Sequence, residues 1–177
     1  MTREQLEQAI RAATELARVD EVVVFGSQAI LGSFPDAHPK LLQSVEVDMC
    51  PLHEPDRVDE IEAVAGELSQ FAQTHGFYIH AIPITEAATL PAGWRDRLIP
   101  VGNANTERRT GWCLEPHDLA ASKLAGFREK DRDYVRTLLV EGFIRPETLD
   151  ARIRALPLDD AKINRMLAWL QATSKHD

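Results

Sequence analysis

The sequence of 177 residues predicts an α+β fold, in which a small mixed β-sheet with packed helices is followed by a helical carboxyl-terminal region. Two observations predict it. Apolar runs that suit strands alternate with helical patterns in the first two thirds of the chain, and only helical patterns come after them. We expect residues 1–114 to form the α/β core and residues 115–177 to pack on it, which gives one compact unit.

The first elements are a helix, a strand and a turn. Residues 3–18 carry apolar side chains at helical spacing and predict an amphipathic helix. The run 21–25 is continuously apolar after its first residue, which is typical of a buried strand. It ends at Gly26 and Ser27, a pair that suits a tight turn, and the Gly- and Pro-containing segment 32–42 predicts a surface loop.

The next strand, predicted over 44–50, carries the most informative pattern of the chain. Alternation places Val45, Val47 and Met49 on one face and leaves Glu46 and Asp48 together on the other. Carboxylates two residues apart on a strand are about 7 Å from each other and repel by about 2.4 kcal/mol at an effective dielectric of 20. Solvation, a shared proton or a divalent cation such as Mg²⁺ relieves that repulsion, and a wet sheet face is the plain structural alternative.

The remaining elements follow the same rules. Residues 56–74 predict the clearest helix, closed by His75 and Gly76, and 77–82 predicts a third strand. We expect 85–111 to be irregular around the apolar run Leu98–Val101, with a short strand after it. This short strand is predicted over 112–114. Four helices are predicted after it, over 116–126, 130–141, 146–155 and 159–173.

Charge separates the two halves of the chain. The net charge of −8 argues against nonspecific coating of nucleic acid. Residues 1–90 hold 15 acidic and 5 basic residues, whereas residues 91–177 hold 13 and 15. This division suits a protein that binds a metal through acidic groups of the first half and phosphates through basic groups of the second, such as Lys123 and Arg128. The structural alternative is that any single one of these basic residues lies on a solvated surface, which is the more common case.

Cysteine usage and hydropathy predict a cytoplasmic protein. Cys50 and Cys113 each lie in an apolar run and lack metal-ligand spacing, which suits reduced thiols. No stretch approaches the roughly 18 apolar residues of a membrane span, and the chain opens with a charged helical pattern and not with a signal peptide, so no membrane partner is expected.

A helix, a strand ending in Gly26-Ser27 and a following strand with Glu46 and Asp48 resemble the nucleotidyltransferase superfamily built on the polymerase-beta-like core. The resemblance implies that Gly26 and Ser27 approach a nucleoside triphosphate. It also implies that Glu46 and Asp48 bind Mg²⁺, which aligns the attacking oxygen and neutralises the leaving pyrophosphate.

The segment 114–131 is similar to the helix-turn-helix region of AbiEii-type nucleotidyltransferase toxins and of a related family of unknown function. Here Lys123 matches the helical lysine of that family and Asp131 its downstream aspartate. The resemblance implies that Lys123, with Arg128 nearby, contacts the triphosphate, and that Asp131 supports the acceptor or Lys123. Lys123 as a solvated helix residue and Asp131 as a helix cap are the structural alternatives.

The resemblance therefore implies a magnesium-dependent enzyme that moves a nucleoside monophosphate from a nucleoside triphosphate to a hydroxyl acceptor such as an RNA or tRNA end. In AbiEii-like systems such an enzyme acts as a toxin beside an antitoxin partner. Two departures favour a noncatalytic binding or assembly module instead: the gap of 18 residues between Ser27 and Glu46, and His80 on the third strand, where many members carry a third acid. A neutral imidazole at His80 can bind a metal or act as a base. A plain structural domain with a solvated acidic strand is the third alternative.

Overall fold

A computed structural model describes residues 1–174, which form two compact units. The sheet unit consists of Met1–Ala88 and Leu98–Leu114, and the helical unit consists of Thr89–Arg97 and the chain from Glu115 onward. The predicted α+β class is confirmed: a mixed sheet with helices comes first and four helices come last. Within residues 1–174 no helix is both long and apolar enough to cross a membrane.

The sheet has five strands in the order β3-β2-β1-β5-β4. Its strands are β1 (Glu21–Phe25), β2 (Glu46–Pro51), β3 (Tyr78–Ala81), β4 (Ile99–Val101) and β5 (Thr110–Cys113). The central strand β1 runs antiparallel to β2 and parallel to β5, and β2 runs parallel to β3. All of β1 except its first residue is buried, so this strand lies in the centre of the core. Its pairing fixes the positions of β2 and β5 beside it.

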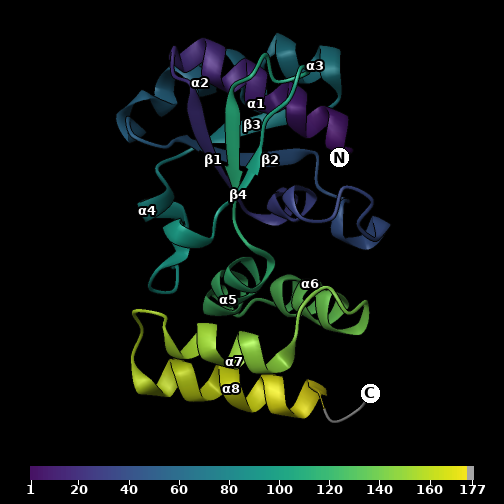
Figure 1. The fold of residues 1–177 in the computed structure, drawn as a ribbon, viewed down its shortest axis with the longest axis vertical. Coiled ribbons are helices and arrows are strands. Elements are labelled where there is room, and N and C mark those ends of the chain that lie inside the picture. The colour runs from purple at the N-terminus through teal and green to yellow at the C-terminus, as the bar shows by residue number, and fades with distance from the viewer. Residues whose placement is uncertain (175–177) are drawn as a thin grey trace. The chain divides into compact units, whose positions relative to one another are not determined.

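Helices pack against the sheet (Figure 1). The sheet unit contains α1 (Arg3–Ala17), α2 (Val58–Ala65), α3 (Gln70–His75) and α4 (Ile84–Ala87), with short 3-10 turns η1 (Ser27–Gly32), η2 (Pro39–Leu41) and η3 (Pro55–Arg57). The helices α1, α2 and α3 pack on the strands, and α1 also contacts α2. Val47 and Met49 of β2 are buried, while Glu46 and Asp48 on the opposite side of the strand are half-buried. The alternation predicted for this strand is confirmed at these four positions.

The prediction of one helix over 56–74 was wrong, because the segment is broken after Ala65. Gly66 adopts an extended conformation that ends α2, and the Ser69 side chain then caps the amino end of α3. The break leaves Val64 51% and Leu68 93% exposed, although their spacing had placed them on the apolar stripe. Local capping therefore outweighed helical periodicity here.

Two further expectations for the sheet unit are corrected. Val45 precedes the paired part of β2 and is 54% exposed, so it does not share the buried face with Val47. The segment 85–111 is less irregular than predicted, because Ile99–Val101 pairs with β5 as an edge strand. Pro100 is tolerated there because only one side of an edge strand needs backbone donors.

The helical unit contains α5 (Pro116–Gly126), α6 (Glu129–Val140), α7 (Pro146–Arg154) and α8 (Asp160–Ser174), close to the four predicted helices. The 3-10 turn η4 (Trp94–Arg97) also belongs to it. In Figure 1 α7 and α8 run side by side, and α5 packs on both α6 and α7. The Asp118 carboxylate is fully buried and accepts two hydrogen bonds from Arg97, so α5 holds the 89–97 segment.

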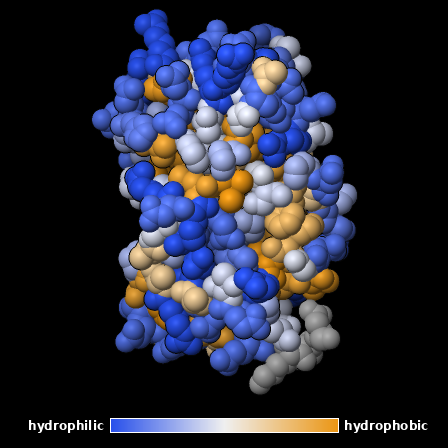
Figure 2. Space-filling view, viewed as in Figure 1, coloured by the Kyte–Doolittle hydropathy of each residue, from blue (hydrophilic) through white to orange (hydrophobic). Residues whose placement is uncertain are grey.

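On the face seen in Figure 2 hydrophilic residues predominate, and hydrophobic side chains show only in separate patches. The large hydrophobic side chains that are exposed within residues 1–174 are Val45, Val64, Leu68 and Val140. Most of the apolar surface is therefore buried in the two cores.

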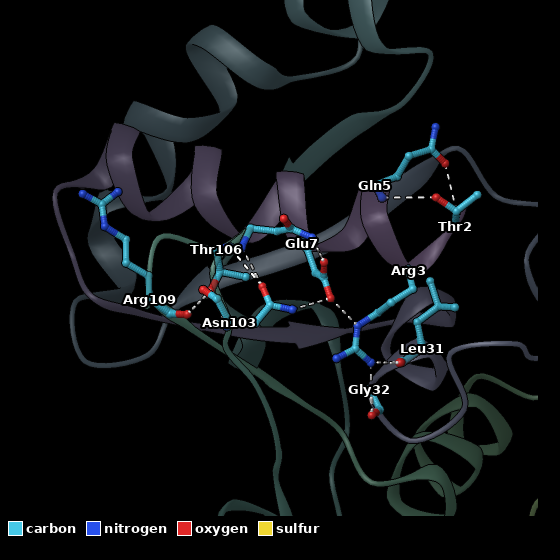
Figure 3. Close-up of polar contacts among 10 residues, drawn as sticks. Thr2, Arg3, Gln5, Glu7, Leu31, Gly32, Asn103, Thr106 and Arg109 are labelled. Carbon is cyan, nitrogen blue, oxygen red and sulfur yellow. Dashed lines mark hydrogen bonds and ion pairs between the residues drawn. The ribbon is translucent and has the colours of Figure 1, made fainter.

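A buried carboxylate ties α1 to the loop between β4 and β5 (Figure 3). Glu7 accepts hydrogen bonds from Asn103 and Asn105, each 2.8 Å long, and from Arg3 Nε at 3.0 Å. Arg3 also donates to the carbonyl oxygen of Leu31. Burial alone would raise the pKa of Glu7, but these donors outweigh it and lower the pKa below its ordinary value of 4.5.

We expect Glu7→Gln to destabilise the protein by roughly 1 to 3 kcal/mol at pH 7, because an amide nitrogen would face donor groups. A lowered pKa in the folded state means that the contribution of Glu7 is fully present above about pH 4.5 and is lost as the pH falls through the folded value. Urea unfolding at several pH values should show the difference between wild type and variant constant above pH 5 and shrinking below it. A difference that grows in acid would contradict the assignment.

Candidate functional site

The Asp48 carboxylate lies against the Gly26 turn. In the antiparallel register Phe25, the last residue of β1, is the partner of Asp48, so the turn that follows comes next to that side chain. Gly26 has φ +74°, and a Cβ atom placed on it would come within 1.9 Å of Asp48 Oδ2. Only glycine allows this backbone conformation and this approach together. The tertiary structure thus brings together the turn and one acid of the predicted pair.

Glu46, Asp48 and His80 form one cluster on the half-exposed side of the sheet. Parallel pairing of β2 with β3 places Glu46 beside Tyr78 and Asp48 beside His80. His80 Nδ1 lies 2.9 Å from Asp48 Oδ1 and 3.8 Å from Glu46 Oε1. One ligand atom from each of the three residues lies within 4.8 Å of the other two. This set of two carboxylates and one imidazole could hold a divalent metal ion.

Tyr78 orients one of these carboxylates. Its hydroxyl donates a 2.6 Å hydrogen bond to Glu46 Oε2, which leaves Oε1 on the side of His80. The alternation of β3 predicts that Tyr78 shares a face with His80, but its contact with Glu46 depends on the strand register, which periodicity does not give. Ligating carboxylates commonly carry such an outer hydrogen bond.

The electrostatics of the cluster reflect two close acids. Burial raises the pKa of Asp48, and the nearby charge of Glu46 raises it further, against the opposing hydrogen bond with His80. Burial alone would lower the pKa of His80, but the hydrogen bond and charge of Asp48, together with the charge of Glu46, raise it overall. The close carboxylates and the imidazole thus favour protons on Asp48 and on His80.

We expect Gly26→Ala to lower the free energy of unfolding by about 1 to 3 kcal/mol from the backbone conformation of φ +74° and ψ −169°, which is essentially restricted to glycine, and by more because Asp48 must move away from the new methyl group. Gly76→Ala is the control for a positive φ without a neighbour, since Gly76 lies in the left-handed region (φ +72°, ψ 14°) and has no neighbouring atom within 4 Å of its Cβ position. Urea unfolding should show a clearly larger loss for Gly26→Ala than for Gly76→Ala. Equal losses in the two variants would show that Asp48 does not lie against the turn.

The other predicted site residues lie in the helical unit. Lys123 on α5 has its Nζ 4.0 Å from Asp131 Oδ1 and 4.6 Å from the centre of the Tyr134 ring. Asp131 is almost fully buried and accepts a 2.6 Å hydrogen bond from Arg128 Nε, which raises the pKa of the Arg128 guanidinium. Lys123 and Arg128 thus both pair with one buried carboxylate, and the amino-terminal cap position of α6 belongs to Arg128 rather than Asp131.

Sequence reasoning missed two features near the sites. Arg97, one of the basic residues of the second half of the chain, is bound to the buried Asp118. Gln28, directly after the turn, is fully buried and donates to the Ser44 carbonyl oxygen at 3.3 Å and to Ser27 Oγ at 3.5 Å. A polar residue inside the apolar run after the turn was the available signal for Gln28.

Comparison with known protein families identifies the family of this chain. A family model described as nucleotidyltransferase of unknown function (DUF6036) matches residues 4–173, nearly the whole chain. Neither the curated proteins nor the solved structures provide a significant match.

Proposed function

Since the chain belongs to this family of nucleotidyltransferases of unknown function, we propose that it is an active, metal-dependent enzyme. In this proposal it transfers a nucleoside monophosphate from a nucleoside triphosphate to a hydroxyl acceptor, such as an RNA or tRNA end. The observation that carries the proposal is the position of Asp48, which lies against the Gly26 turn and within one cluster with Glu46 and His80.

The residues of the sheet unit have distinct proposed roles. Glu46 and Asp48 hold a divalent cation, for which two carboxylates alone predict Mg²⁺. When bound, the cation neutralises charge on the phosphates and orients the attacking oxygen. Gly26 and Ser27 contact the phosphates, because the missing side chain at Gly26 leaves its backbone open to close approach. Tyr78 keeps Glu46 in one orientation through its hydrogen bond.

The helical unit supplies the proposed cationic groups. Lys123 and Arg128 contact the triphosphate and stabilise the charge that moves to the leaving pyrophosphate. Asp131 positions both of them, and its contacts with each support this role. As a positioning residue, Asp131 acts through these two cations. A toxin role beside an antitoxin, as in AbiEii-like systems, is a further proposal that the neighbouring genes would test.

The test combines donor and acceptor. Purified protein is incubated with each of the four radiolabelled ribonucleoside triphosphates, total cellular RNA, and either Mg²⁺ or Mn²⁺. We expect label to enter RNA with one triphosphate and a divalent cation, and EDTA to abolish it. Cation-dependent triphosphate binding without transfer to RNA or to protein would identify the noncatalytic binding module instead. Binding of neither cation nor triphosphate would support a plain structural domain.

A further inference from the structure

We infer that His80 is a metal ligand, and that the two carboxylates and one imidazole of this centre select a divalent transition-metal ion such as Mn²⁺ over Mg²⁺. The inference deepens the proposed function, because it names the cation of the same site. It concerns the choice of ion, which neither the family description nor the acid pair determines.

The first argument is geometric. In an octahedral complex with bonds near 2.1 Å, adjacent donors lie about 3 Å apart and opposite donors about 4.2 Å apart. The Asp48 Oδ1 to His80 Nδ1 distance of 2.9 Å matches adjacent donors. The Glu46 Oε1 to His80 Nδ1 distance of 3.8 Å falls between the two cases. One ion can therefore contact all three side chains once their donor atoms, which lie within 4.8 Å of one another, adjust toward octahedral spacing.

The second argument concerns which atoms remain available. Tyr78 occupies Glu46 Oε2, so the other oxygen of that carboxylate is directed to the His80 side. His80 presents Nδ1 to both acids, and its side chain is 42% exposed, so water can complete the coordination of a bound ion. The imidazole is thus built into the cluster by strand pairing of β2 with β3 and does not reach it from a mobile loop.

The third argument is the chemistry of the donors. Mg²⁺ prefers oxygen ligands and keeps several waters, whereas imidazole nitrogen favours first-row transition metals. Replacing a third carboxylate by imidazole lowers the negative charge of the site and so weakens the attraction for every divalent ion, but the nitrogen donor compensates only for ions that bind imidazole. The same replacement adds a nitrogen ligand that is typical of Fe²⁺, Ni²⁺ and Zn²⁺ sites and that also favours Mn²⁺, the weakest binder of the first-row series, over Mg²⁺.

The decisive measurement uses Mn²⁺ as the probe and needs no catalytic turnover. Metal-free full-length protein is titrated with Mn²⁺ and, separately, with Mg²⁺ by calorimetry. Electron spin echo modulation of the bound Mn²⁺ then reports directly coordinated nitrogen. We expect a nitrogen signal in the wild type, its loss in His80→Gln, and its retention in His53→Gln, an exposed histidine on the same unit. Absence of the nitrogen signal from the wild type would overturn the inference.

Two variants separate ligand identity from positioning. Mn²⁺ binds many carboxylate sites more tightly than Mg²⁺, so the readout is the change in preference rather than the preference itself. We expect His80→Asp to reduce the ratio of Mn²⁺ to Mg²⁺ affinity by at least about tenfold. Tyr78→Phe should weaken both ions by about 10- to 100-fold and leave the ratio unchanged. An unchanged ratio in His80→Asp would overturn the inference.

Failure of this inference and failure of the proposed function are distinguishable. If the protein transfers nucleotide to RNA with Mg²⁺ and bound Mn²⁺ shows no nitrogen signal, the proposed enzyme activity is supported and the role of His80 as a ligand is contradicted. If Mn²⁺ binds with a nitrogen ligand but no triphosphate is bound or transferred, the metal site is supported and the proposed transferase activity is contradicted.

Discussion

Asp48→Asn should reduce nucleotide transfer by about a thousandfold, which corresponds to roughly 4 kcal/mol of transition-state stabilisation. The substitution keeps the shape of the side chain but removes the charge that, in our proposal, holds the cation beside the Gly26 turn. The variant should remain as stable as the wild type or become more stable. The reason is that burial and the neighbouring Glu46 raise the pKa of Asp48, so the folded protein favours its neutral form.

Initial rates of label transfer and urea unfolding of the same preparations measure both effects. Asp36→Asn is the matched control, since Asp36 is an exposed acid in the loop before β2 and its loss should leave both quantities unchanged. Full activity in Asp48→Asn would contradict the enzyme proposal. Lost activity together with a large loss of stability would show instead that Asp48 is a structural residue.

Asp118→Ala should cause the largest loss of stability, roughly 3 to 5 kcal/mol. Its fully buried carboxylate accepts hydrogen bonds of 2.8 and 3.0 Å from Arg97, and Arg152 Nε lies 3.0 Å from it as an ion pair without a directed hydrogen bond. Burial raises the pKa of Asp118 despite these partners, so the carboxylate itself contributes little net stability. The loss expected from the variant comes mainly from leaving two guanidinium groups without a counter-charge.

Urea unfolding followed by circular dichroism and tryptophan fluorescence measures this change, because Trp94 and Trp169 report on the helical unit. Asp118→Asn keeps the shape of the side chain and one acceptor oxygen. Its free energy of unfolding should therefore lie between those of Asp118→Ala and the wild type. Asp150→Asn is the control, since the ion pair of Asp150 with Arg154 lies on the surface of the same unit and its loss should not shift the midpoint. Equal effects of Asp118→Ala and Asp150→Asn would contradict the buried network.

Several features of the candidate site could be predicted from local patterns. Alternation in β2 puts Glu46 and Asp48 on one side of a strand whatever the strand pairs with, because the side-chain period is two. The apolar run before Gly26 predicts a buried strand that ends in a turn, and the structure has both. The α+β class followed from the same patterns. Periodicity failed at 56–74, where Gly66 and Ser69 end one helix and start another through local hydrogen bonds.

What the sequence by itself determined is most of the strands and helices, the face shared by the two acids, and the resemblance to nucleotidyltransferases that the family match then supported. What only the tertiary structure decided is which side chains meet. Gly26 touches Asp48, Tyr78 binds Glu46, and His80 joins both acids, because β1 and β3 pair with β2 in one particular register. A shift of one residue in either register would leave the local patterns intact and separate these groups.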